Sequence, residues 1–259
     1  MSGTKPFYIT TPIYYVNDKP HIGHAYTSLA CDVMARFKRL DGFNVKFLTG
    51  TDEHGQKVEK SAMLKGIAPQ EFTDQVSKNF QDLAAFMGYT NDDFIRTTQE
   101  RHKIACKALW EKLLEKGDIY LGAYEGWYAV RDEAFYTEDE TEKKADGSRI
   151  AKASGAEVEW VEEPSYFFKL SAWEDKLLKF YDENPDFILP KSRRNEVISF
   201  VKGGLQDLSV SRTTFKWGVP VPNDDAHIMY VWLDALTNYL TAVGYPDLDA
   251  EQYKEFWPA

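Results

Sequence analysis

The sequence predicts an α/β fold, in which a parallel sheet packs against helices and a mixed α+β insertion interrupts the pattern. Short apolar runs alternate with stretches of helical periodicity in residues 1–116, and this alternation resumes in residues 213–259. Residues 117–212 are instead rich in tyrosine and tryptophan separated by glycines. We therefore expect the first half of an α/β domain at 1–116, an insertion at 117–212, and the start of the second half at 213–259.

The first part opens with a strand and a helix. Residues 7–10 form a short apolar run that ends before Pro12, which is typical of a buried strand. Helical spacing begins at about His24 and ends at Gly42, because glycine commonly terminates helices. The apolar face predicted for this helix consists of Leu29, Val33, Phe37 and Leu40.

Further strands and helices follow at the spacing expected for a parallel sheet. We predict strands at 45–48, before Gly50, and at 94–96, with helices at 56–65, from 69 to about 86, and at 101–116. Strands and helices that alternate in this way form right-handed crossovers. Ligands of such sheets bind at the carboxyl ends of the strands.

The insertion and the last part are predicted from composition as much as from periodicity. Residues 119–136 suggest β-hairpins, and the polar stretch 137–150 suggests a solvated loop. Helical pieces are expected near 172–182 and 193–202. The α/β pattern then resumes with a strand at 227–232 and a helix at 233–243.

Composition excludes several classes of protein. The formal net charge of −10 and the pI of about 5.1 argue against a protein that coats DNA or RNA generally. No apolar run approaches the length of a membrane span, and the first residues do not resemble a secretory signal, so we expect a cytoplasmic protein. Only Cys31 and Cys106 are present, so we expect no structural zinc and no bound metal except Mg²⁺ arriving with a nucleotide.

The first candidate site is the tetrad His21-Ile22-Gly23-His24, which lies between the first predicted strand and the first helix. A helix start offers backbone N–H groups and a positive dipole end to a phosphate. Gly23 removes a side chain where a nucleotide needs close approach. His21 and His24 can donate hydrogen bonds to phosphate oxygens, although both could also be ordinary loop and cap residues. The surrounding strand and helix favour the nucleotide-binding interpretation.

The second candidate site is Thr49-Gly50-Thr51-Asp52-Glu53-His54-Gly55, at the end of the second predicted strand. It should lie on the same edge of the sheet as the tetrad. A carboxylate at this edge can pair with a substrate ammonium group. An aspartate at such a turn can also act as a helix N-cap, alone or in addition. His54 is given no catalytic role.

The third candidate site is the stretch Y-V-W-L-D-A-L-T-N-Y at residues 230–239. Its apolar members recur at three, four and seven residues, which is the spacing of one helical face: Trp232, Ala235, Leu236 and Tyr239. Spacing of this kind by itself more often indicates core packing than a ligand pocket.

These motifs together resemble the class I aminoacyl-tRNA synthetases in their methionine-specific version. The resemblance covers T-T-P-I-Y-Y-V-N at 10–17 with the tetrad after it, T-G-T-D-E-H-G at 49–55, and the stretch at 230–239. It implies a Rossmann-like domain with a connective-peptide insertion, whose return is similar to residues 200–222. Many relatives bind zinc through four cysteines in that insertion, but residues 127–136 contain none, so the resemblance is to the zinc-free branch.

The resemblance also implies an activity and residue roles. A methionine–tRNA ligase activates L-methionine with ATP and transfers it to tRNA(Met). His21, Gly23 and His24 would contact ATP, with the two histidines catalytic, and Asp52 would bind the methionine amino group. The methionine side chain would lie against Tyr15, Trp232, Ala235, Leu236 and Tyr239, with backbone contacts from Ile13. Aromatic rings suit a polarizable thioether.

No Lys-Met-Ser-Lys-Ser loop occurs in the 259 residues, so we expect a fragment that lacks this phosphate-binding loop and the anticodon-binding domain. Such a fragment should show little or no methionine-dependent ATP–pyrophosphate exchange. Three alternatives remain open. One is another nucleotidyl-transferring enzyme with a HIGH tetrad, and a second is a valine, isoleucine or leucine synthetase, although neither matches the insertion. The third is a synthetase-like piece that binds a ligand without turnover.

Overall fold

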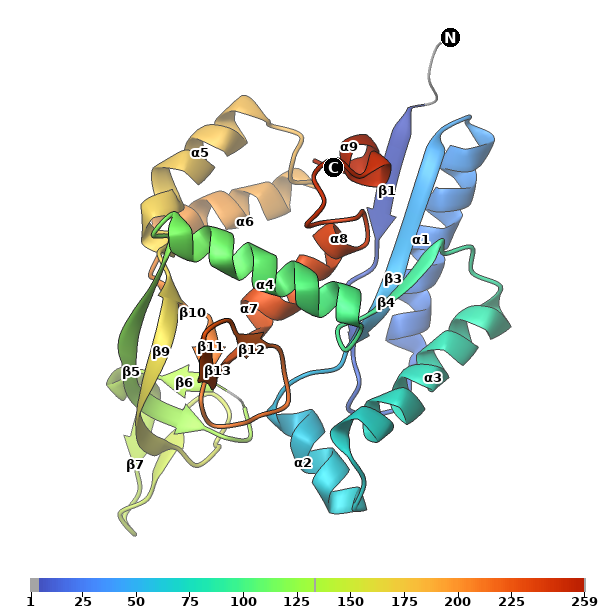
Figure 1. Cartoon of the computed structure of the whole chain (residues 1–259). Helices are drawn as coiled ribbons and strands as arrows, with labels where there is room; N and C mark the ends of the chain where they lie inside the picture. The colour runs from blue at the N-terminus through green and yellow to red at the C-terminus, as the bar shows by residue number, and fades with distance from the viewer. Residues whose placement is uncertain (1–4, 133, 259) are drawn as a thin grey trace. The chain divides into compact units, whose positions relative to one another are not determined.

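The computed structural model describes residues 5–132 and 134–258, which form two compact units (Figure 1). One unit consists of the described residues up to Glu115 together with those from Thr214 onward, and the other runs from Lys116 to Thr213. The first unit contains the parallel sheet and the second an antiparallel sheet with helices, so the predicted α/β class is confirmed. The assignment of 1–116, 117–212 and 213–259 as functional parts stays a prediction.

The sheet of the first unit is built around β3 (Asn44–Asp52). This strand pairs in parallel with β1 (Pro6–Thr10), β2 (Tyr14–Tyr15) and β4 (Asp93–Arg96). Residues 45–51 of β3 are buried, which explains why the strand reads as an almost continuous apolar run. The sequence analysis missed β2, because two residues are too short to show a periodicity.

Four helices of the first unit lie within two residues of their predicted bounds. They are α1 (Ile22–Leu40), α2 (Gln56–Lys65), α3 (Pro69–Met87) and α4 (Glu100–Glu115). α1 runs along the sheet, where Ala35 packs with Val45 and Phe47 of β3 (Figure 1). α2 and α3 cover a second cluster that includes Val58 and Phe72.

The apolar face predicted for α1 does not face the core. Phe37 is 58% exposed and Leu40 89%, and Leu29 and Val33 are exposed as well. The buried residues of α1 are Ser28, Asp32 and Ala35. The Asp32 carboxylate accepts hydrogen bonds from the backbone and hydroxyl of Thr90 and from Arg36, so its burial is compensated. Hydrophobic spacing alone could not show that a bonded carboxylate takes the core side.

The last part of the first unit begins with β12 (Pro220–Val221) and β13 (Asp224–Met229), which form an antiparallel pair. Short helical segments follow: α7 (Val231–Asp234), the 3₁₀ turn η3 (Ala235–Thr237), α8 (Asn238–Thr241) and α9 (Glu251–Phe256). The predicted strand 227–232 is therefore wrong beyond residue 229, and the predicted helix 233–243 is divided. The backbone N–H of Leu233 bonds to the Tyr230 carbonyl at 3.0 Å, which starts the helix. A short apolar run does not by itself distinguish a strand from a helix.

The second unit contains the sheet β10-β9-β5-β6. β5 (Ile119–Ala129) pairs antiparallel with β9 (Glu159–Phe168) and β6 (Ala134–Tyr136), and β10 (Leu208–Ser209) pairs with β9. The predicted hairpin within 119–136 is confirmed by the β5–β6 pair. The predicted helices correspond to α5 (Glu174–Glu183), which follows η2 (Leu170–Trp173), and α6 (Lys191–Lys202). A two-residue strand, β11 (Ser211–Arg212), lies near the end of the unit.

The predicted loop at 137–150 is wrong, because it contains regular structure. A short turn, η1 (Glu138–Glu140), leads into a hairpin of β7 (Thr141–Lys143) and β8 (Arg149–Ala151). The guanidinium of Arg149 lies over the Trp127 ring, 4.3 Å from its centroid. Such a cation–π contact stabilises a hairpin whose own residues are polar. Among the described residues, no helix is long and apolar enough to cross a membrane.

Replacement of Gly50 by alanine should destabilise the fold at the β3–β4 contact. A Cβ at this position would lie 2.1 Å from the Ile95 carbonyl oxygen, so the two strands must separate. We expect a loss of about 3 kcal/mol or more in the free energy of unfolding, measured with urea. Gly66→Ala is the control, because its helix-end site has open space and only an unfavourable positive φ, which costs about 1 kcal/mol. Equal losses in both variants would contradict this packing.

Candidate functional site

The tetrad begins α1 through an exchange of hydrogen bonds between its two histidines and the backbone. His21 is the N-cap, and its Nδ1 accepts from the backbone N–H of Gly23 at 3.1 Å. His24 Nδ1 accepts from the backbone N–H of His21 at 3.1 Å. The two imidazole rings stack with their centroids 3.8 Å apart. This is a capping box in which imidazoles replace the usual hydroxyl and carboxylate.

The capping geometry determines which histidine atoms remain for a ligand. Because each Nδ1 accepts a hydrogen bond, the proton of a neutral ring lies on Nε2, which can donate. Burial, followed by the neighbouring His21, lowers the pKa of His24, so this ring is neutral near pH 7. The two Nε2–H groups lie on stacked rings and can both donate to phosphate oxygens.

One expectation for the tetrad is wrong in detail. The backbone N–H groups of His21 and Gly23 are bonded to imidazole nitrogens and are not free for a phosphate. Gly23 is nevertheless required, because a Cβ there would lie 2.9 Å from Cε1 of the His21 ring. The glycine therefore makes room for the histidine cap itself.

Asp52 is the last residue of β3 and lies opposite Tyr15 of β2 in the parallel register. The backbone N–H of Val16 donates to the Asp52 carbonyl, so the bonds between β2 and the end of β3 continue one residue past Tyr15. Burial and, next, the charge of Asp234 raise the pKa of Asp52 to about 7, while His54 opposes them. Two carboxylates that act on each other, one of them the buried Asp234, favour a cationic ligand.

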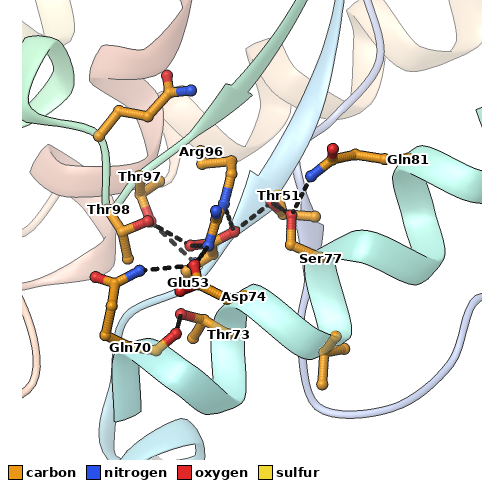
Figure 2. A network of polar contacts seen from close by, with 12 residues as sticks. Thr51, Glu53, Gln70, Thr73, Asp74, Ser77, Gln81, Arg96, Thr97 and Thr98 are labelled. Carbon is orange, nitrogen blue, oxygen red and sulfur yellow. Dashed lines mark hydrogen bonds and ion pairs between the residues drawn. The ribbon is translucent and has the colours of Figure 1, made fainter. Parts of the chain in front are cut away.

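Glu53, the next residue, is completely buried and fully hydrogen-bonded (Figure 2). Arg96 donates to both carboxylate oxygens, with Nε at 2.7 Å and Nη2 at 2.9 Å. Thr51 and Thr98 donate their hydroxyls to the same carboxylate at 2.7 and 2.5 Å. The Thr97 hydroxyl accepts the backbone N–H of Glu53. A buried charge that is paired and bonded in this way fixes its backbone firmly.

This network extends onto α3, as Figure 2 shows. Arg96 also donates to Asp74, and the Thr51 hydroxyl lies 3.0 Å from that of Ser77. The sequence analysis missed this role of Glu53. Its only signal was a run of two acids and a histidine directly after a buried strand, which does not distinguish a ligand-binding residue from a structural one.

The predicted side-chain wall is only partly assembled. Ile13 and Tyr239 pack against the same buried cluster, which includes Leu48 and Ile95. The Tyr8 hydroxyl donates to the Tyr239 carbonyl and ties this segment to β1. Ala235 is buried, as core packing requires. Trp232 and Leu236 keep about half of their surface exposed, at 49% and 54%.

One buried group contains metal-ligand residue types, and the sequence analysis missed it. His102 and Cys106 are one turn apart on α4, and their donor atoms lie within 4.8 Å of each other and of an Asp234 oxygen. Each donor already has a hydrogen-bond partner. His102 Nε2 lies 2.9 Å from Asp234 Oδ1 and 3.2 Å from the Cys106 sulfur. Burial raises the pKa of Cys106 well above its usual value, which disfavours the thiolate that ligation needs.

Comparisons with known proteins agree with this geometry. The family described as tRNA synthetases class I (M) matches residues 7–259. The methionine–tRNA ligase of Rickettsia bellii is 68% identical over 253 residues, which are 98% of this chain and 48% of that protein. The ligase of Rhizobium meliloti is 61% identical over 259 residues, covering 100% of this chain and 50% of that protein. The chain thus spans about half the length of the curated relatives that it matches.

Solved structures show the same likeness. Mycobacterium tuberculosis methionyl-tRNA synthetase in complex with methionyl-adenylate superposes with a TM-score of 0.92 at 54% identity, over 99% of this chain and 50% of that one. The apo form of that enzyme gives a TM-score of 0.81 at 52% identity, over 99% and 49%. A Rossmann-like parallel sheet with the tetrad at its edge is the catalytic fold of class I aminoacyl-tRNA synthetases. The chain belongs to the methionine-specific family of that class.

Glu53→Gln should destabilise the first unit, because it leaves the partly buried Arg96 without its full charge partner. We expect the free energy of unfolding to fall by about 3 kcal/mol, since removal of one member of a buried pair is costly. Asp82→Asn is the matched control. It breaks the exposed Lys78–Asp82 pair on α3, which should change stability by no more than about 0.5 kcal/mol. Urea denaturation of both variants measures the difference, and similar losses would contradict the role of Glu53.

Proposed function

We propose that this chain is the front half of the catalytic domain of a methionine–tRNA ligase. A carboxylate oxygen of L-methionine attacks the α-phosphorus of ATP and forms methionyl-adenylate, while pyrophosphate leaves with the electrons of the broken P–O bond. The methionyl group then passes to a ribose hydroxyl of the terminal adenosine of tRNA(Met), and AMP leaves. The observation that carries this proposal is the pairing of Asp52 with Tyr15 at the sheet edge, next to a second buried acid, Asp234.

The two histidines of the tetrad are proposed to act on the phosphate. Their Nε2–H groups would donate to the α-phosphate oxygens, where negative charge grows as the pentacovalent phosphorus forms. Donors of this kind are typically worth about 2.7–4 kcal/mol of transition-state stabilisation. The cap holds both rings by Nδ1, which reduces the reorganisation needed when the nucleotide binds. Gly23 allows this arrangement at the ATP site.

Methionine is proposed to bind between a charged end and an apolar end. The Asp52 carboxylate would pair with the ammonium group, and Tyr15 lies directly beside it in the register. Ile13 and Tyr239, which share one cluster, would limit the pocket, with Ala235 below and the exposed surfaces of Trp232 and Leu236 available to the thioether. A ligand of this chemistry is supported by the similar M. tuberculosis structure, which was solved in complex with methionyl-adenylate.

The other partners follow from the same family membership. ATP would enter with Mg²⁺, and no structural zinc is proposed, because the four-cysteine pattern of many relatives is missing from the sequence. We propose a cytoplasmic protein that acts on tRNA(Met) and not on DNA or membranes.

Calorimetric titration of the 259-residue chain tests the ligand. We expect L-methionine to bind and L-leucine to bind at least about tenfold more weakly, because an apolar pocket discriminates similar side chains by about 10–200-fold. Trp232→Ala should weaken methionine binding and reduce the difference between the two ligands. Trp160, exposed on the second unit, provides the control variant Trp160→Ala, which should change neither affinity. A preference for leucine would contradict the pocket assignment.

The affinity for methionine should depend on pH through Asp52. The pKa of about 7 belongs to a carboxyl that must be ionised to pair with an ammonium group. Affinity should therefore be constant above pH 7 and fall below it, approaching tenfold per pH unit, because protonation of Asp52 competes with binding. Asp52→Asn should bind weakly and lose this dependence. Calorimetry from pH 5.5 to 8 measures both, and a profile shared by the two proteins would refute the role of Asp52.

A further inference from the structure

His54 connects the proposed amine site to the segment that carries the methionine pocket. It lies two residues after Asp52, is 6% exposed, and its Nδ1 is 2.7 Å from Oδ2 of Asp234. Asp234 ends α7, between Trp232 and Ala235 of the proposed pocket. A single short contact therefore joins the strand end at Asp52 to the helical segment 231–241.

Asp234 is itself held by a second histidine. Its Oδ1 lies 2.9 Å from Nε2 of His102 on α4, and Nδ1 of that ring is 3.3 Å from the Thr241 hydroxyl. A carboxylate that accepts from both rings requires a proton on His54 Nδ1 and on His102 Nε2. Both Asp234 carboxylate oxygens therefore have a histidine partner. Loss of the His54 contact would leave one oxygen of this buried carboxylate unpaired.

The other side of His54 is closed by Trp217. The two rings meet edge to face with centroids 5.5 Å apart. The Trp217 indole N–H donates to the Glu53 carbonyl at 2.6 Å. The backbone carbonyl of Trp217 accepts from the backbone N–H of Gly55 at 3.0 Å. The backbone N–H of His54 bonds to the Asp52 carboxylate. Each residue of the segment 52–55 therefore makes at least one of these contacts. The Asp52 carboxylate is oriented by the backbone N–H of His54.

Without a charge on His54, the buried acids around it would outnumber the cations that pair with them. Asp52, Glu53 and Asp234 are acids, and Arg96 pairs only with Glu53 among these three. His102 and the buried Cys106 thiol face Asp234, while Lys103 is the other cation that acts on His54. Burial opposes the charged form of His54, but Asp234 and then Asp52 outweigh it and raise its pKa. Burial opposes the charged form of Asp234, but the charge of His54 and the hydrogen bonds from His102 and His54 hold the pKa of Asp234 well below its usual value.

We infer that His54, clamped by Asp234 with His102 behind it, is a positioning residue that keeps Asp52 ionised for the substrate ammonium and sets its distance from the pocket segment. This inference rests on the proposed function and deepens it. Protonated His54 supplies the positive charge that separates Asp52 from Asp234. A neutral side chain in its place would leave the two carboxylates to repel each other, and Asp52 would then bind a proton in preference to methionine.

The pH profile of methionine binding in His54→Asn tests the inference. The asparagine Nδ2 can replace the Nδ1–H donor toward Asp234 but carries no charge. We expect the midpoint of the affinity profile to rise by about one pH unit, so that binding at pH 7 weakens several-fold to about tenfold and recovers by pH 8.5. His54→Ala should show the same shift and also a weaker plateau, because the tie to Asp234 is lost.

His227→Asn is the matched control, since His227 is also buried and faces an aspartate, Asp224, at 3.8 Å. Its profile should equal that of the unmodified chain. If the unmodified chain binds methionine but His54→Asn keeps the original midpoint, the inference is wrong while the proposed function stands. If the unmodified chain binds no methionine at any pH, the proposed function fails and this inference fails with it.

A measurement on the unmodified chain avoids any folding defect of the variants. Nitrogen-15 NMR of the imidazoles should find His54 as the cation at pH 6.5, with Nδ1–H hydrogen-bonded. A neutral His54 ring at that pH would overturn the inference, and a cationic ring supports it independently of the substitutions.

Discussion

The buried Glu53–Arg96 pair is the interaction on which the candidate site depends. It lies at the end of β3. It anchors the backbone there to β4 through Arg96, to the turn after β4 through Thr98, and to α3 through Asp74. A carboxylate without water must have all its hydrogen bonds supplied by protein, so the surrounding side chains leave it little freedom. The backbone of Asp52 is held in place as well, because Asp52 directly precedes Glu53.

The site combines two buried hydrogen-bond networks, one centred on Glu53 and Arg96 and the other on His54 and Asp234. Glu53 pairs with a permanent cation, Arg96, which makes its network a structural anchor. On the other side of the chain, His54 pairs with Asp234, and a histidine can lose its charge within the physiological range. Asp52, whose pKa burial and Asp234 raise to about 7, feels the charges of both networks. A site of this kind can bind a cation tightly while it remains sensitive to the charge of one imidazole.

Much of the fold could be predicted from local pattern. The bounds of α2 agree with prediction at both ends, because a glycine followed by polar residues at the start and a left-handed glycine, Gly66, at the end are local signals. Predictions failed where distant partners decide. The buried side of α1 depends on the bonds that Asp32 makes with Thr90, and the hairpin at 141–151 depends on Arg149 meeting Trp127. Neither contact leaves a periodic trace in the sequence.

The sequence by itself determined the α/β class and the place of the tetrad at the first helix, because these follow from the order of strands and glycines along the chain. Only the tertiary structure decided which neighbours of Asp52 matter. His54, His102 and Asp234 are far apart in sequence, and their hydrogen bonds exist because α4 and α7 pack beside the strand end. The charge of a buried group depends on its surroundings in three dimensions, and those surroundings appear only when the chain is folded.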